Sequence, residues 1–135
     1  MFKVDHLGIA VKSIAQARRF YEQLGMKVMD EEVVEHEKLR AAMVPVGESR
    51  FELLEGTSDD SVIAKFIAKR GEGLHHVAVH VNDISATFEE LKRKGVRLIS
   101  DEIKVGAGGH LYIFVHPSAT GGVLLELCQD AISAV

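Results

Sequence analysis

VDHLGIAVKSI (residues 4–14) and LHHVAVHVNDI (residues 74–84) are two copies of one pattern within a chain of 135 residues. Each copy has a His at its third position, continues with an alternating run of apolar residues and ends in Ile. Alternation of this kind is typical of a β-strand with one buried face. Because the copies lie 70 residues apart, the sequence indicates a duplicated structural unit.

The similarity between the halves continues beyond these strands. Gly25 and Gly95 are also 70 residues apart, and each follows a segment with apolar residues at helical spacing. These two segments begin at Ser13 and Asp83, which are good N-cap residues. The sequence therefore predicts one helix in each half, closed by a glycine in the left-handed conformation.

The end of each half is repeated as well. RFELLEG (residues 50–56) resembles LLELCQD (residues 124–130), and the equivalent Glu52 and Glu126 are 74 residues apart. The second half therefore has four additional residues, and the glycine-rich segment KVGAGGH (residues 104–110) is the expected loop for them. Neither Lys-Ser nor Lys-Thr follows these glycines, so the segment is not a P-loop.

Each half is predicted to be a β-α-β-β-β module. We expect the first module at about 1–57, a linker helix at about 58–72 and the second module at about 73–130, all within one domain. The predicted strands are residues 3–11, 26–37, 39–47, 50–56, 74–82, 96–103, 111–117 and 122–129.

Strand alternation predicts where the repeated polar residues point. His6 and His76 each share a strand face with small residues, while bulky aliphatic residues occupy the other face. Glu52 and Glu126 likewise point away from their apolar neighbours in the chain. Two imidazoles and two carboxylates suit zinc, cobalt, nickel, manganese or iron(II) better than calcium or copper(I). The repeat therefore predicts one divalent metal ion held by these four residues.

Composition narrows the class of protein. Apolar residues make up 47% of the chain and charged residues 27%, as in ordinary globular proteins. The net charge of −4 gives no reason to expect nucleic acid or an anionic membrane as a partner, and no apolar run could span a bilayer. The chain starts directly with a strand pattern and has one cysteine, Cys128, so we expect a cytoplasmic protein without disulfides.

The duplicated module with ligands on its first and last strands resembles the vicinal oxygen chelate superfamily, which is also called glyoxalase-like. This resemblance implies an α+β fold in which two tandem β-α-β-β-β modules form a curved, incomplete-barrel sheet around a metal cleft. Within the superfamily, the sequence is most similar to the methylmalonyl-CoA epimerase family over nearly the whole chain. The matching segments are DHLGIAV (5–11), GLHHVAV (73–79) and GAGGHLYIFVHPSATGGVLLEL (106–127).

The resemblance implies ligands and a reaction. His6, His76 and Glu126 match the family's metal ligands, and Glu52 stands where members carry Gln or Glu. The implied reaction interconverts (R)- and (S)-methylmalonyl-CoA by 1,1-proton transfer through a metal-stabilised enolate, without an organic cofactor. Glu126 is expected as one base and Glu52 as the other, with Glu37 as an outside candidate. The expected contacts with the acyl-CoA substrate are Gly108, Gly109 and His80, and the expected assembly is a homodimer.

The sequence departs from the family at two places. Some members carry a glutamate base on the third strand of the first half, where this chain has KLRAAMV (residues 38–44), which contains no carboxylate. Glu35 and Glu37 lie nearby, but their use requires a shifted alignment. Ser118 follows the His-Pro pair where a Lys often stands, so the residues that contact the coenzyme phosphates stay unassigned.

Several rival functions share the superfamily fold. Glyoxalase I uses a similar ligand set on a glutathione hemithioacetal, but the GAGG loop and the His-Pro ending favour the epimerase. A module that sequesters antibiotics needs no metal, so the retention of four ligands argues against it. An extradiol dioxygenase uses two His and one carboxylate, and Glu52 would occupy a position needed for oxygen and substrate. His75 and Cys128 are expected to be structural residues.

Overall fold

The computed structural model describes residues 2–130 of the chain. These residues form two compact units, a first unit of residues 6–75 and a second unit of residues 2–5 together with 76–130. Strands β1 (Lys3–Ala10) and β5 (Gly73–His80) each contribute residues to both units. Among residues 2–130, no helix has the length and apolar character needed to cross a membrane.

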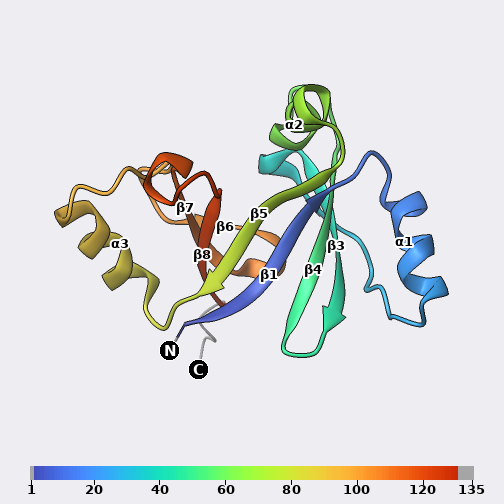
Figure 1. The fold of residues 1–135 in the computed structure, drawn as a ribbon, viewed down its shortest axis with the longest axis horizontal. Helices are drawn as coiled ribbons and strands as arrows, with labels where there is room; N and C mark the ends of the chain where they lie inside the picture. The colour runs from blue at the N-terminus through green and yellow to red at the C-terminus, as the bar shows by residue number, and fades with distance from the viewer. Residues whose placement is uncertain (1, 131–135) are drawn as a thin grey trace. The chain divides into compact units, whose positions relative to one another are not determined.

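The first unit contains four strands in the order β2-β3-β4-β1 (Figure 1). Strand β1 is parallel to β4, and the other neighbours are antiparallel. The remaining elements are β2 (Glu32–Val34), the 3₁₀ turn η1 (Glu35–Glu37), β3 (Leu39–Val46), β4 (Ser49–Gly56) and the helices α1 (Ile14–Gln23) and α2 (Val62–Arg70).

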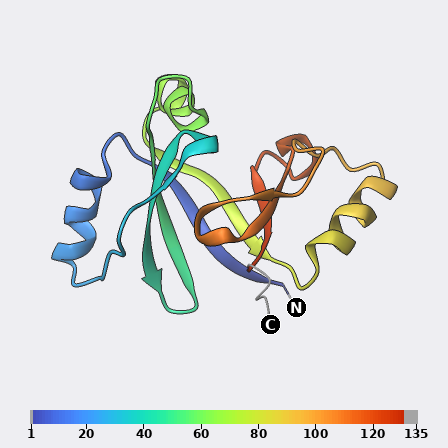
Figure 2. The same cartoon turned by 180° about the vertical axis from the view of Figure 1, so that it is seen from behind.

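The second unit repeats this plan in the order β5-β8-β7-β6. Strand β5 is parallel to β8, and β7 lies beside β8 in both views (Figure 1 and Figure 2). The remaining elements are α3 (Ile84–Arg93), β6 (Lys104–Val105), β7 (Leu111–Val115), β8 (Leu125–Gln129) and the 3₁₀ turns η2 (Ala107–Gly109) and η3 (Pro117–Ala119). The two units thus confirm the duplicated β-α-β-β-β plan.

The predicted ends of the equivalent helices are confirmed. Ser13 Oγ accepts the backbone N–H of the residue three positions on at 3.2 Å, and Asp83 Oδ1 accepts the corresponding N–H at 3.0 Å. After the helices, Gly25 and Gly95 have φ angles of 97° and 73°. A side chain is strained at such angles, so both positions favour glycine.

Each helix covers the bulky face of its own sheet. In the first unit, Ile9 and Val11 pack with Ile14 of α1, and in the second unit Val79 and Val81 pack in the same way with α3. The buried members of the two cores are Val11, Ile14, Val28, Ala42, Val44 and Leu53, and Val81, Ile84, Phe88, Ile113, Val115 and Leu127. Since strand faces alternate, His6 and His76 point away from these cores.

Two predicted strands are wrong in extent. Only Glu32–Val34 of the predicted strand 26–37 is regular, because the exposed charged residues Asp30 and Glu31 precede it and the turn η1 follows it. The segment 96–103 runs beside β7 with two hydrogen bonds and the single bridge between Leu98 and Val115, and then turns away at a polar stretch. The short strand β6 forms instead within the segment that was expected to be a loop.

Candidate active site

The first unit brings His6 and Glu52 together. Glu52 pairs with Gly8 across the parallel strands β1 and β4, so His6, two residues before Gly8, lies on the same face. His6 Nε2 is 3.3 Å from Glu52 Oε1, and the two residues are 0% and 5% exposed. A buried carboxylate requires a polar partner of this kind, because burial alone would penalise its charge.

The second unit forms the equivalent pair from His76 and Glu126. Glu126 pairs with Ala78 across β5 and β8, which places His76 on the same face as the carboxylate. His76 Nε2 is 3.4 Å from Glu126 Oε1, and both residues are buried. The duplication therefore extends to the geometry of the His–Glu pairs, at the positions that the sequence predicted.

Both pairs fit the donor set of a divalent ion. Two donor atoms bound to one ion at about 2.1 Å lie roughly 3.0 Å apart at a right angle and roughly 3.4 Å apart at the tetrahedral angle. The His6–Glu52 and His76–Glu126 distances match this separation. Each pair offers an imidazole nitrogen and a carboxylate oxygen away from solvent, so the donors of each pair suit a metal ion chemically.

A third imidazole contacts the pair of the second unit. His110 Nε2 lies 3.5 Å from Glu126 Oε2, and the His110 side chain is only 11% exposed. His110, Tyr112 and Phe114 alternate at the start of β7, and Phe114 pairs directly with Glu126 on β8. The sequence predicts a loop for the glycine-rich segment and therefore does not place His110 in the site. The alternation with two aromatic residues was the signal that could have placed it on the face of Glu126.

Strand β3 offers no carboxylate on the face of Glu52. Met43 pairs directly with Glu52, and Ala41 shares the face of Met43. Glu37 lies in η1, where its carboxylate is 3.7 Å from His36 Nε2. Glu32, which the sequence-based site did not include, pairs with Ala41 from the edge strand β2 and is exposed.

The expected substrate residues lie at defined places in the second unit. Gly108 and Gly109 belong to the turn η2 and have positive φ angles of 69° and 76°. Their backbone conformation therefore favours glycine, whatever contacts they make. His80, at the end of β5, is half-buried and pairs with Cys128 across the strands.

His75 packs within the first unit. Its ring meets that of Phe66 on α2 edge to face, with the ring centroids 4.9 Å apart. Burial lowers the pKa of His75, against the opposing influence of the Glu52 charge. A half-buried ring in an aromatic contact supports a structural role for this residue.

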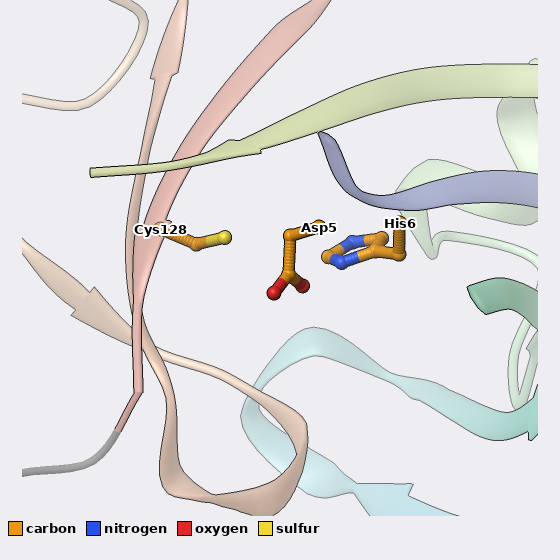
Figure 3. A group of neighbouring side chains, drawn as sticks. All are labelled: Asp5, His6 and Cys128. Atoms are coloured by element: carbon orange, nitrogen blue, oxygen red, sulfur yellow. The ribbon is translucent and has the colours of Figure 1, made fainter. Parts of the chain in front are cut away.

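Cys128 is a small buried residue of β8. In Figure 3 its Sγ is directed toward Asp5, which belongs to the same unit and is also buried. The Cys128 thiol donates to the Val79 carbonyl at 3.8 Å. Cys128 thus fills space beside Asp5 and the Val79 carbonyl. Its burial agrees with the structural role expected from the sequence.

A family model for the Glyoxalase/Bleomycin resistance protein/Dioxygenase superfamily matches residues 5–114. The chain belongs to this superfamily. It is 41% identical over 130 residues to the uncharacterized protein YqjC of Bacillus subtilis, a match that covers 96% of this chain and 93% of that protein. It is 38% identical over 129 residues to the mitochondrial methylmalonyl-CoA epimerase of Bos taurus, covering 94% of this chain and 74% of the relative.

Solved structures show the same similarity at the level of the fold. A methylmalonyl-CoA epimerase in complex with methylmalonyl-CoA and NH4+ aligns with a TM-score of 0.91 and 37% identity, over 97% of this chain and 96% of that one. These findings confirm the predicted glyoxalase-like fold class and the resemblance to methylmalonyl-CoA epimerases.

Proposed function

We propose that this superfamily member is a metal-dependent epimerase that interconverts (R)- and (S)-methylmalonyl-CoA. The observation that carries the proposal is the buried His–Glu pair at equivalent strands of both units. The pairs occur in a chain that matches methylmalonyl-CoA epimerases over nearly its whole length. The other parts of the proposal are an acyl-CoA substrate, a homodimeric assembly and a cytoplasmic location.

In this proposal, His6, Glu52, His76 and Glu126 together hold one divalent ion. Support comes from the donor types and from the 3.3 and 3.4 Å separations within the pairs, which suit ligands of one ion. When bound, the ion would supply positive charge that stabilises the negative charge formed on the substrate. This stabilisation of the transition state is worth several kcal/mol. The chain's own contribution is the arrangement of these donors and the transfer of protons.

Glu126 removes or returns the proton on one face of the substrate's α-carbon. Its carboxylate is buried, and its two oxygens face two different imidazoles, His76 and His110. These contacts restrict the rotation of the carboxylate. A base that is held in one orientation can meet the substrate without first reorganising, as general base catalysis requires.

Glu52 is the proposed base for the opposite face. Inversion of a carbon centre requires a proton acceptor on each side, and Glu52 occupies in the first unit the position that Glu126 occupies in the second. On this face of β3, Ala41 and Met43 carry no carboxylate. Glu52 is therefore the acidic side chain that the β3–β4 pair offers there. Glu37 stays the alternative, from the neighbouring turn η1.

The substrate contacts are proposed for the second unit. Gly108 and Gly109 carry no side chains in the turn η2, which suits the close approach of an acyl-CoA. His80 is the proposed polar contact at the end of β5.

Proton–deuterium exchange tests the proposed reaction. The purified, metal-loaded protein is incubated with methylmalonyl-CoA in heavy water, and incorporation at the α-carbon is measured by mass spectrometry with and without a chelator. We expect rapid exchange together with inversion, and loss of both on chelation. Absence of exchange combined with turnover of the glutathione–methylglyoxal adduct would replace the epimerase by a glyoxalase, and inertness toward both would favour a binding module.

A further inference from the structure

Glu126 lies between two imidazoles of its own unit. Its Oε1 is 3.4 Å from His76 Nε2, and its Oε2 is 3.5 Å from His110 Nε2. The two oxygens of the carboxylate therefore have different neighbours. Glu126 is a proposed metal ligand together with His76, so the oxygen near His76 is the one that faces the ion. The other oxygen, near His110, faces away from His76.

The turn before β7 holds the His110 ring in place. His110 Nδ1 lies 2.6 Å from the Ala107 carbonyl oxygen, and the His110 carbonyl accepts the Gly106 N–H at 2.9 Å. A Cβ on Gly106 would approach the His110 ring to 2.9 Å, which is too close for a real contact. The Tyr112 ring lies beside the imidazole, with centroids 5.7 Å apart.

The Ala107 carbonyl also fixes which nitrogen of His110 is used. A carbonyl oxygen and a carboxylate oxygen can only accept, so Nδ1 donates to Ala107 and the ion-pair contact of Nε2 with Glu126 Oε2 is that of a ring protonated on both nitrogens. Contacts at both nitrogens, one with the backbone and one with a carboxylate, restrict the rotation of the imidazole. The ring is thus a rigid support on the outer side of Glu126.

We propose that His110 is a positioning residue for Glu126. It holds Oε2, so that Oε1 stays directed toward His76 as a ligand and the carboxylate keeps one orientation. The inference rests on the part of the proposed function that makes Glu126 a metal ligand, and it adds a residue outside the four-ligand set. Partners that orient a metal ligand from the outer side usually change metal affinity by about 10–100-fold when they are removed.

Two substitutions separate the contacts of His110. The amide of His110→Asn can replace Nδ1 and keep the bond to the Ala107 carbonyl, but it cannot reach Glu126. The longer side chain of His110→Gln places its amide near Nε2 and can keep the contact with Glu126. His110→Ala removes both contacts and provides a second variant without the Glu126 contact, should His110→Asn fail to fold.

The control removes a histidine elsewhere in the chain. His36 lies in the first unit and its side chain is 60% exposed. His36→Gln should leave the metal affinity within about threefold of wild type, as exposed substitutions usually do.

The measurement is the affinity for the metal alone. Metal-free full-length protein and each variant are titrated with Co²⁺, followed by the visible absorption of the bound ion, and thermal unfolding is recorded in parallel. We expect the dissociation constant to rise by about 10–100-fold in His110→Asn and His110→Ala, and to stay close to the wild-type value in His110→Gln. An unchanged dissociation constant in His110→Asn or His110→Ala would overturn the positioning role, as would an equal loss in His110→Gln.

Failure of this inference can be told apart from failure of the proposed function. The Co²⁺ titration contains no substrate, so its outcome does not depend on epimerisation. A protein that leaves the α-proton of methylmalonyl-CoA unexchanged, but shows the expected ranking of the His110 variants, would lose its proposed reaction and keep its positioning residue.

Discussion

Glu126→Gln tests the double role proposed for Glu126 as ligand and base. The amide has the shape of the carboxylate and keeps one oxygen, which can stay directed toward His76 at the place of Oε1. Its NH₂ group then faces His110 Nε2, which accepts in the neutral ring, where the one remaining proton stays on Nδ1 toward the Ala107 carbonyl. The substitution therefore preserves the packing and a ligand atom, and it removes the basicity.

The expected loss of rate in Glu126→Gln follows from the removal of the base while one ligand oxygen is kept. A positioned general base contributes about 10²–10⁴-fold to a rate, which corresponds to roughly 2.7–5.4 kcal/mol of transition-state free energy. Because a neutral amide binds a divalent ion less tightly than a carboxylate, the variant is assayed with enough metal to saturate it. We expect the metal-loaded Glu126→Gln protein to lose about 10²–10⁴-fold in kcat.

The assay measures α-proton exchange and inversion of methylmalonyl-CoA at matched metal occupancy, which is determined by metal analysis of the same samples. Near-normal turnover of metal-loaded Glu126→Gln would refute the reasoning. It would mean that the carboxylate serves only as a ligand, and that both bases must be sought elsewhere, beginning with Glu35 and Glu37.

Further predictions concern the metal, the second base and the fold. His76→Ala should lose the ion and the activity while circular dichroism shows the fold retained; unchanged metal stoichiometry would argue against the site. Glu37→Gln should change kcat by no more than about threefold, and a loss as large as that of Glu126→Gln would make Glu37 the second base. Gln129→Ala removes the acceptor of the Ile84 N–H, a bond of 2.8 Å, so urea unfolding should show a loss of about 1 kcal/mol; unchanged stability would show that water replaces the bond.

The duplicated architecture was predictable because the signals that specify it are local. Ser13 and Asp83 cap helices, Gly25 and Gly95 end them, and the apolar alternation of the first strands defines their buried faces. The extents of the second strands were not predictable in the same way. A strand such as β6 depends on β7 for its hydrogen bonds, and the segment 96–103 forms with β7 the isolated bridge at Leu98 in place of a regular strand.

The His–Glu pairs were predictable for the same reason, since alternation along a strand assigns each side chain to a face. His110 was not assigned, because its position depends on the turn that closes on Gly106 and directs the ring back to Glu126. The turn itself is set by the backbone conformation of several glycines and leaves no periodic signal, but the alternation of His110 with Tyr112 and Phe114 does assign His110 to the face of Glu126. The missing carboxylate on β3 was visible in the sequence, and the structure adds that Met43 faces Glu52 there.

The last strand of each half connects the proposed ligand to the helix of that half. Glu55, three residues after Glu52, accepts the N–H of the first residue of α1 at 2.7 Å, and Gln129, three residues after Glu126, accepts the equivalent N–H of α3 at 2.8 Å. An odd separation along a strand places the two side chains on opposite faces. One face of β4 or β8 therefore carries the ligand while the other binds a helix N-terminus.

This arrangement explains why both halves keep a three-residue spacing between the proposed ligand glutamate and the residue that accepts the helix N–H. A shift of β4 or β8 by one residue would move the ligand to the apolar face and, at the same step, remove the acceptor from the helix N-terminus. An unsatisfied N–H at a buried helix end costs about 1–3 kcal/mol. The register that holds Glu52 and Glu126 beside their histidines is thus also the register that satisfies the helices, so that folding of each half fixes the orientation of its proposed metal ligands.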